Sequence, residues 1–474
     1  MPAITRRMFL ERAGSLPALL HFGRTSRAVF SEWKREFFRQ SSVGAALEAG
    51  QSLPAGIPGD PKSSLTIPPL GERFPDLARH FVFEYYPWYA REPWRHWNEA
   101  GRRPPEDLAT EYFPLLGPYD SRSRTVIEQH ARWIADSGAG SISLSWWGNG
   151  NFEDRGVHEV MDVMKDHGIA VTFGLEPYAT DRGYRFANDV LYLLTKYGER
   201  RGWDAFLILR NADGSESPVL KGFRCILPET IVDCHGVTRS VPDYTPDDLW
   251  RRQIQIVRRE LRWDFDKIIL LADSLDFGRT PASGFDGIGI YDNFIGPERY
   301  HPLARAASER ELLFSFNVNP GYDEILQEYV APDSCYESRP FAPPTDPPLD
   351  FERFDHRERA AELSAGRIRD SLAATIEAQS DESLSNYRRG FFLVYVNSFN
   401  EWHEGHAFEP MMNDADLTRE QRLHGYHNPR YGDYRLAALS NGLKPYASDG
   451  LGAPGWQRGT PEGPGAREPE RDRA

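Results

Sequence analysis

The chain has 474 residues, with 56 Lys+Arg against 70 Asp+Glu, a formal net charge of −14. This acidic balance leaves no general phosphate-binding surface and argues against nucleic acid as a partner. No run reaches the roughly 18 apolar residues of a transmembrane helix. Aromatic residues make up 13% of the chain and gather in clusters such as "FVFEYYPWY" and "SWW", which is typical of a core but also of a cleft that stacks on sugar rings.

The N-terminus, "MPAITRRMFLERAGSLPALLHF", carries a pattern of its own. Arg6-Arg7 followed by Phe9-Leu10 resembles a bacterial twin-arginine signal, which predicts a signal over residues 1–30 and export to the periplasm or the medium. The apolar stretch is short, contains Pro17 and has no clean cleavage site. The alternative is an ordinary basic N-terminal helix on a cytoplasmic protein.

Residues 31–79 then read as an extension or linker, with a helical patch, "FSEWKREFFRQ", and a stretch rich in Pro, Gly and Ser. Residues 80–447 form the predicted main folded domain. Residues 448–474 are rich in Gly, Pro and charge and are predicted to be a disordered tail.

Within the predicted domain, short apolar runs alternate with longer helical patterns. The expected helices include 124–138, 156–168, 185–198, 246–263 and 357–379, several of which close with Gly as a helix C-terminus does. The expected strands are 80–86, 140–146, 169–176, either 206–209 or 222–227, 267–273, 286–292, 312–318 and 391–397.

Eight buried strands alternating with helices predict an α/β fold, a (β/α)₈ TIM barrel. A doubly wound open sheet is the alternative, but no glycine-rich phosphate loop follows the first strand. The three cysteines, Cys225, Cys234 and Cys335, form neither a CxxC nor part of a metal motif, so no cofactor or metal is expected. Two alternatives remain: a disulfide between Cys225 and Cys234, or three inert thiols.

In a barrel, function lies where strands end and βα loops begin. Aromatic, amide and acidic side chains gather at those places, above all in "NSFNEWHEG" after the eighth strand. Glycoside cleavage needs one acid to protonate the leaving oxygen and a second carboxylate as nucleophile or base. Glu401 and Glu404 are therefore the candidate catalytic pair. The candidate substrate-binding residues are Tyr86, His96, Trp97, Trp146, Trp147, Glu176, Tyr178, Tyr291, Asn400 and Trp402.

"SFNEWHEG" (398–405) resembles the signature of glycoside hydrolase family 99, the endo-α-1,2-mannosidases and their relatives. Other segments agree in order: "EYYPWY" (84–89), "HWN" (96–98), "YFPLLGPYDSRS" (112–123), "SWW" (145–147), "LEPY" (175–178), "FDGIGIY" (285–291) and "PGYDE" (320–324). The resemblance covers roughly residues 81–410, and the octapeptide is its specific part. It implies a (β/α)₈ barrel.

The resemblance further implies retaining hydrolysis of an internal α-mannosidic bond without a metal. Glu401 would act as a base on the 2-hydroxyl of the sugar, giving a 1,2-anhydro intermediate, and Glu404 as acid and then base. Tyr291 and Trp146 would line the subsites, while Glu176 and Tyr178 would bind hydroxyls.

The sequence departs from the family pattern at Gly174, where a His is usual, and in "HAFEP" after the motif, where a threonine-containing run is usual. We therefore expect an endo-acting α-glycosidase acting on an oligo- or polysaccharide whose sugar the sequence leaves open. The alternatives are a family-99-like barrel in surface-polysaccharide assembly and a non-catalytic carbohydrate-binding barrel.

Overall fold

The structure, a computed structural model, describes residues 70–232, 235–325 and 341–446. The predicted signal, the extension up to residue 69 and the C-terminal tail from residue 447 lie outside these ranges, as do Cys234 and Cys335. None of the helices in the described ranges is long and apolar enough to cross a membrane.

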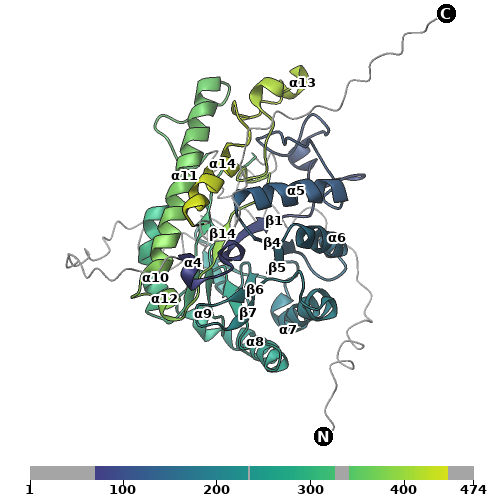
Figure 1. The fold of residues 1–474 in the computed structure, drawn as a ribbon. Helices are drawn as coiled ribbons and strands as arrows, with labels where there is room; N and C mark the ends of the chain where they lie inside the picture. Colours follow the sequence, from purple (N-terminus) through teal and green to yellow (C-terminus); the bar gives the residue numbers. More distant parts are fainter. Residues whose placement is uncertain (1–69, 233–234, 326–340, 447–474) are drawn as a thin grey trace, which may run out of the picture.

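Eight parallel strand positions form a barrel, and Figure 1 shows helices arranged around it. The hydrogen-bonded order is β12-β11-β10-β7-β5-β4-β1-β14-β13. The strands β12 and β13 are two halves of the seventh strand: β12 pairs with β11 and β13 with β14, which closes the barrel. Their bounds are β1 Phe81–Tyr85, β4 Ser141–Trp146, β5 Ala170–Leu175, β7 Glu216–Gly222, β10 Ile269–Ala272, β11 Gly287–Gly289, β12 Leu313–Ser315, β13 Asn317–Val318 and β14 Val394–Val396.

The expected helices are present, and helix α14 completes the outer layer by packing between α11 and α5. The helix α5 ends at Gly138, which adopts a left-handed conformation (φ 91°), as the sequence predicted for its C-terminus. The bounds are α5 Arg124–Ser137, α6 Phe152–Asp166, α7 Arg182–Leu193, α8 Asp247–Leu261, α10 Tyr300–Ser308, α11 Phe354–Ser380 and α14 Tyr434–Leu443; the short helices are α4 Leu70–Arg73, α9 Arg279–Ala282, α12 Ser385–Arg388 and α13 Arg419–Arg422.

The fourth barrel strand is β7, so both sequence-based positions for it, 206–209 and 222–227, are wrong. Residues 206–209 join the same sheet without being the fourth barrel strand: Phe206 makes a parallel bridge to Val171, and β6 (Ile208–Arg210) pairs antiparallel with β7. The sequence "SPVLKG" was missed because a lysine interrupts its apolar pattern. That Lys221 points into the barrel, where it forms an ion pair with Glu84.

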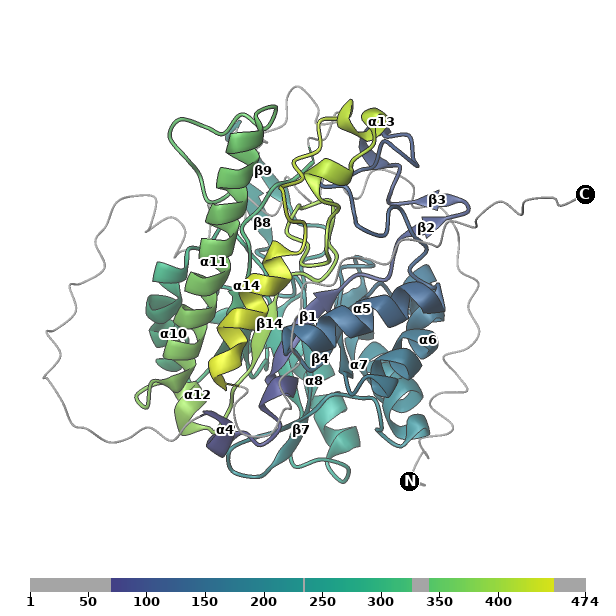
Figure 2. The same ribbon diagram turned by 45° about the horizontal axis from the view of Figure 1, so that its top comes forward.

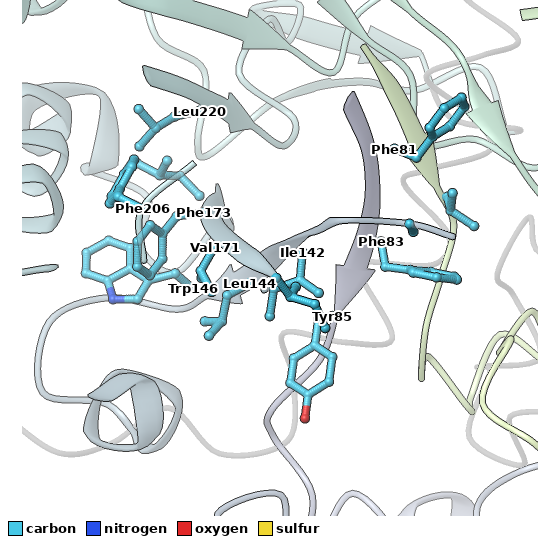
Figure 3. Packing of buried hydrophobic residues seen from close by; sticks show 14 of the residues in the cluster. Phe81, Phe83, Tyr85, Ile142, Leu144, Trp146, Val171, Phe173, Phe206 and Leu220 are labelled. Atoms are coloured by element: carbon cyan, nitrogen blue, oxygen red, sulfur yellow. The ribbon is translucent and has the colours of Figure 1, made fainter. Parts of the chain in front are cut away.

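Side chains alternate along each strand between the barrel interior and the surrounding helices. Outward-facing residues such as Phe83, Ile142 and Phe173 form the main core against the helices (Figure 3). Inward-facing residues such as Val82 and Val219 form a second, smaller cluster inside the barrel. The barrel interior is thus apolar at the level of Val82 and Val219. The next layer of inward-facing residues, nearer the carboxyl ends of the strands, is polar.

Loops at the carboxyl ends of the strands cover that polar layer. Figure 2 shows the β2–β3 hairpin (Ala90–Arg91, Trp94–Arg95), the β8–β9 hairpin (Thr230–Val232, Thr238–Ser240) and α13 at the same end of the barrel. A third buried cluster, rich in tyrosine and tryptophan, packs the loop after β1 against the segment after β14, while the β8–β9 hairpin packs on a separate small cluster of Leu227 and Val241. The fold therefore provides a rigid floor with an aromatic wall above it.

Candidate active site

A pocket opens at the carboxyl end of the barrel and encloses about 890 Å³, including open solvent at its mouth. Its floor is the inward-facing polar layer of the strands, and its walls come from the βα loops. Six of the residues singled out from sequence line it: Tyr86, Trp147, Glu176, Tyr291, Glu401 and Glu404. These six side chains meet at the carboxyl-end face of the barrel.

The loop that carries both candidate glutamates is fastened to the barrel by backbone and amide contacts. Phe399 donates its N–H to the carbonyl oxygen of Glu84 at 2.7 Å. The Asn400 side chain accepts the N–H of Tyr86 at 2.8 Å and donates to the Tyr86 carbonyl at 3.0 Å. The Asn397 amide donates to the Tyr291 carbonyl at 2.7 Å. The two asparagines of "NSFN" therefore tie the loop to the ends of β1 and β11.

Glu401 is 3% exposed and lies against His403. Its Oε1 accepts the backbone N–H of His403 at 3.0 Å and lies 3.1 Å from His403 Nδ1. The opposite ring nitrogen, Nε2, lies 2.9 Å from the carbonyl oxygen of His96, which can only accept. Nε2 therefore carries a hydrogen, and the Nδ1–carboxylate contact needs one further proton between the two groups. When that proton is on His403, Glu401 is an ionised base.

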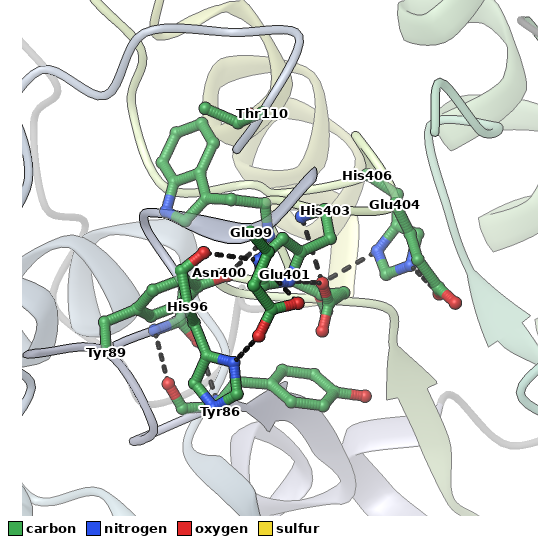
Figure 4. Close-up of polar contacts among 12 residues, drawn as sticks. Tyr86, Tyr89, His96, Glu99, Thr110, Asn400, Glu401, His403, Glu404 and His406 are labelled. Atoms are coloured by element: carbon green, nitrogen blue, oxygen red, sulfur yellow. Dashed lines mark hydrogen bonds and ion pairs between the residues drawn. The ribbon is translucent and has the colours of Figure 1, made fainter. Parts of the chain in front are cut away.

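Glu404 has different partners. Its Oε2 accepts the hydroxyl of Tyr291 at 2.5 Å. The same oxygen lies 2.8 Å from Nε2 of His406, and Figure 4 shows Glu404 beside His406. Burial and the charge of Glu404 raise the pKa of Tyr291 well above its usual value, so the phenol remains a donor near neutral pH. The two carboxylates of the loop thus share one pocket but sit in separate hydrogen-bonding environments, which is the condition for dividing acid and base roles.

A third acid lies across the pocket. Glu176 Oε1 accepts the hydroxyl of Ser145 at 2.8 Å, and the same hydroxyl accepts the indole N–H of Trp147 at 3.1 Å. Burial, together with the charges of Glu176 and Glu401, raises the pKa of Tyr86. An uncharged phenol and an oriented carboxylate are suitable partners for sugar hydroxyls, and the Trp147 ring supplies an apolar face.

Strand alternation decides which tryptophan of "SWW" reaches the pocket. Ser143, Ser145 and Trp147 face inward, so Trp146 faces the helices (Figure 3). The Trp146 ring is fully buried and donates its N–H to Asp154 of α6 at 3.0 Å. Trp146 is thus a strand–helix packing residue and does not line the pocket, contrary to the role that the family resemblance implied.

Five further candidates lie behind the pocket wall rather than in it. Asn400 and Trp402 are fully buried, and Trp402 donates its indole N–H to Glu409 at 3.0 Å. Trp97 is buried and donates to the carbonyl of Tyr119 at 2.8 Å. His96 lies 2.6 Å from Glu99, and the Tyr178 hydroxyl bonds to Asp189. The contacts described here hold these five side chains in place behind the pocket wall.

The list of candidate residues left out several that do line the pocket. Glu84 and Lys221 lie on its floor, and Trp88, Glu99 and His403 are in its wall. An acid inside the apolar run "FVFEYY" and a lysine inside "PVLKG" were the available signals, because a charge within a buried strand has to face a partner or a cavity.

The described residues contain one cluster with the spacing of a metal site: His96, Glu99 and His403, whose donor atoms lie within 4.8 Å of one another. These groups already bond to each other and to Glu401, since His96 Nδ1 contacts Glu99 and Nδ1 of His403 contacts Glu401. Figure 4 shows the cluster as part of the hydrogen-bond network around Glu401.

An acidic, aromatic-lined pocket at the mouth of a (β/α)₈ barrel is the arrangement of a sugar-cleaving enzyme, so the chain belongs to the glycoside hydrolase class of barrels. Comparison with known proteins specifies the family. The model described as "Glycosyl hydrolase family 99" matches residues 76–207. This match and the named relatives support a member of glycoside hydrolase family 99, in agreement with the resemblance found in the motifs.

The sequence similarity to named relatives extends over most of the chain. It is 29% identical over 370 residues to glycoprotein endo-alpha-1,2-mannosidase of Xenopus laevis, which covers 71% of both proteins. It is 25% identical over 410 residues to the protein of that name from Rattus norvegicus, covering 80% of this chain and 77% of the other. The GH99 endo-alpha-mannosidase structure from Bacteroides thetaiotaomicron has the same fold, with a TM-score of 0.53, 19% identity, and coverage of 78% of this chain and 98% of that one.

Proposed function

We propose that the protein is a retaining, endo-acting α-mannosidase in which Glu401 is the base and Glu404 the acid/base. Its relatives by name are endo-acting glycosidases, which supports an endo-acting glycosidase as the coarser conclusion. The observation that carries the finer proposal is the placement of both carboxylates in one pocket with different partners.

The proposed reaction has two steps. In the first, Glu401 takes the proton of the sugar 2-hydroxyl, O2 attacks C1, and the C1–O bond to the leaving sugar breaks. Glu404 gives its proton to the departing oxygen. In the second, Glu404 takes a proton from water, the water oxygen attacks C1, and the 1,2-anhydro ring opens as O2 regains its proton from Glu401. Two inversions at C1 give net retention.

Two substitutions test the division of roles. A general acid matters most when the leaving group is poor. Glu404→Gln is therefore expected to abolish nearly all cleavage of an α-linked oligosaccharide but to reduce hydrolysis of an activated glycosyl fluoride much less. Glu401→Gln removes the base and is expected to slow both substrates by roughly 10²–10⁴-fold. Equal, small losses in both variants on both substrates would refute the assignment.

A screen of defined substrates identifies the sugar that the enzyme cleaves. Defined α-linked oligosaccharides are incubated with the enzyme and the products are read by mass spectrometry, while NMR of the first-formed anomer reports retention. An internal cut in an α-mannoside is the expected result. Binding of glycans without any cleavage would favour the non-catalytic alternative, and cleavage only of a different α-glycan would redefine the substrate.

A further inference from the structure

Glu409 is a fully buried carboxylic acid at the end of the loop that carries the two proposed catalytic residues. Its backbone N–H donates to the carbonyl oxygen of Phe399 at 2.7 Å, which brings the end of this loop back to its beginning. No step of the proposed reaction uses the Glu409 side chain. Because a buried carboxylate is costly unless it is hydrogen-bonded, its partners indicate what it does.

One oxygen of this carboxylate, Oε2 of Glu409, accepts hydrogen bonds from two buried aromatic side chains. The indole N–H of Trp402 donates to it at 3.0 Å, and the hydroxyl of Tyr119 donates at 2.7 Å. The direction of the first bond is fixed, because an indole N–H can only donate. Trp402 directly follows Glu401 in the sequence, so Oε2 holds one neighbour of the proposed base.

Tyr119 connects the same oxygen to the other neighbour of Glu401. Its hydroxyl oxygen accepts the side-chain N–H of Asn400 at 3.2 Å. The orientation of that amide is fixed, because its Oδ1 accepts the backbone N–H of Tyr86 at 2.8 Å. Burial and the charge of Glu409 raise the pKa of Tyr119 well above its usual value, so the phenol keeps its hydrogen and donates it to Oε2. Both residues that flank Glu401 are thus tied to one oxygen atom of Glu409.

The other carboxylate oxygen is anchored outside the loop. Glu409 Oε1 lies 3.1 Å from Nε2 of His130, a fully buried residue of α5. Nδ1 of the same ring lies 3.0 Å from the hydroxyl oxygen of Tyr85 in β1. We propose that Glu409 is a positioning residue that holds Glu401 in place through the two residues that flank it. This inference rests on the proposed role of Glu401 as the base.

Two variants separate hydrogen bonding from packing. Glu409→Leu removes both oxygens, whereas Glu409→Gln keeps an oxygen that can accept from Trp402 and Tyr119. A misplaced base slows every substrate, so Glu409→Leu is expected to reduce kcat by roughly 10- to 100-fold on an α-linked oligosaccharide and equally on a glycosyl fluoride, with KM changed by less than about 3-fold. Glu409→Gln is expected to stay within about 5-fold of the wild type on both substrates, the effect of one altered hydrogen bond.

Gln379→Leu provides a matched control for the loss of stability. Gln379 is 1% exposed, and its Oε1 accepts the N–H of Leu393 at 2.9 Å and the side-chain N–H of Asn386 at 3.0 Å, just before β14. Each leucine substitution therefore removes an oxygen that accepts two buried donors, and both are expected to lower the melting temperature. Gln379→Leu is expected to change kcat of the folded enzyme by less than about 3-fold, because its contacts lie outside the loop of Glu401.

A Glu409→Leu loss confined to the oligosaccharide, or no larger than that of Gln379→Leu, overturns the proposal. A Glu409→Gln enzyme as impaired as Glu409→Leu overturns it as well. If Glu409→Leu does not fold, Trp402→Phe removes one of the same bonds and keeps a ring; it is expected to slow both substrates equally, by roughly 3- to 10-fold, and an unchanged kcat overturns the proposal. If Glu401→Gln fails to slow both substrates, the proposed function itself fails; if Glu401→Gln slows both and the Glu409 and Trp402 variants do not, this inference alone fails.

Discussion

At the scale of single residues, the floor of the pocket contains a buried ion pair between Glu84 of β1 and Lys221 of β7. The side chains are 7% and 3% exposed. The ammonium of Lys221 also lies 4.1 Å from the ring centroid of Tyr395. A buried charge that loses its partner is strongly destabilising, whereas replacing both charges by uncharged groups is often tolerated.

Lys221→Met is therefore expected to lower the free energy of unfolding by about 3–5 kcal/mol, since it leaves the Glu84 carboxylate buried without its cation. The double variant Glu84→Gln/Lys221→Met is expected to recover most of that loss. Urea unfolding followed by circular dichroism measures both. A double variant that is as unstable as Lys221→Met would mean that packing of the lysine stem, rather than its charge, matters here.

His80, just before β1, provides a second residue-scale prediction. It is 1% exposed and donates from Nδ1 to the Phe392 carbonyl at 2.7 Å. Burial lowers the pKa of His80 from 6.5 to about 4. The unfolded chain therefore binds a proton that the folded protein does not, so stability is lost as pH falls from 6.5 towards 4, by up to about 3 kcal/mol.

The variant His80→Asn keeps a donor for Phe392 but cannot take up that proton. We expect the difference in unfolding free energy between wild type and this variant to narrow as pH falls from 7 to 4.5, measured by urea titration at each pH. A constant difference over that range would contradict the assignment to His80.

At the scale of elements, the turn that ends the loop of Glu401 and Glu404 depends on Gly405. Its φ is +65°, and a Cβ placed there would collide with the backbone carbonyl of Asp323. Gly425 provides a matched control, because its φ is +73° and no atom lies within 4 Å of an added Cβ. The two glycines share the left-handed conformation and differ in crowding.

Gly425→Ala is expected to destabilise the protein by about 1–2 kcal/mol through backbone strain alone. Gly405→Ala is expected to add about 1–3 kcal/mol of overpacking and to reduce kcat, because Glu404 directly precedes the turn. Thermal melting and oligosaccharide turnover test this pair. Equal stability and equal activity of the two variants would show that the loop can move away from Asp323.

At the scale of the whole molecule, export remains a prediction, since Arg6 and Arg7 lie outside the described residues. If the leader acts as a twin-arginine signal, Arg6-Arg7→Lys-Lys is expected to retain the protein in the cytoplasm. Cell fractionation with an antibody to the protein measures this. An unchanged periplasmic or secreted yield would show that the arginine pair is accidental.

Much of the barrel was predictable from the sequence, because strands buried on both faces are continuous apolar runs and the helices between them end in recognisable signals. Seven of the eight strand positions were predicted on this basis. The fourth was not, because Lys221 breaks the apolar pattern of β7. The reason for a lysine within such a run is clear only from the structure, because its ion-pair partner, Glu84, lies more than a hundred residues away in the sequence.

The sequence by itself was enough to predict the fold class, the resemblance to glycoside hydrolase family 99 and the loop that carries Glu401 and Glu404, since these follow from local motifs and periodicity. Only the tertiary structure decided which candidates face the pocket. Trp146 and Trp147 are adjacent and chemically alike, yet strand alternation places the first in the core and the second in the pocket wall. The partners of the two glutamates, His403 and His406, were likewise decided by geometry, because hydrogen bonds depend on distances that residue order does not contain.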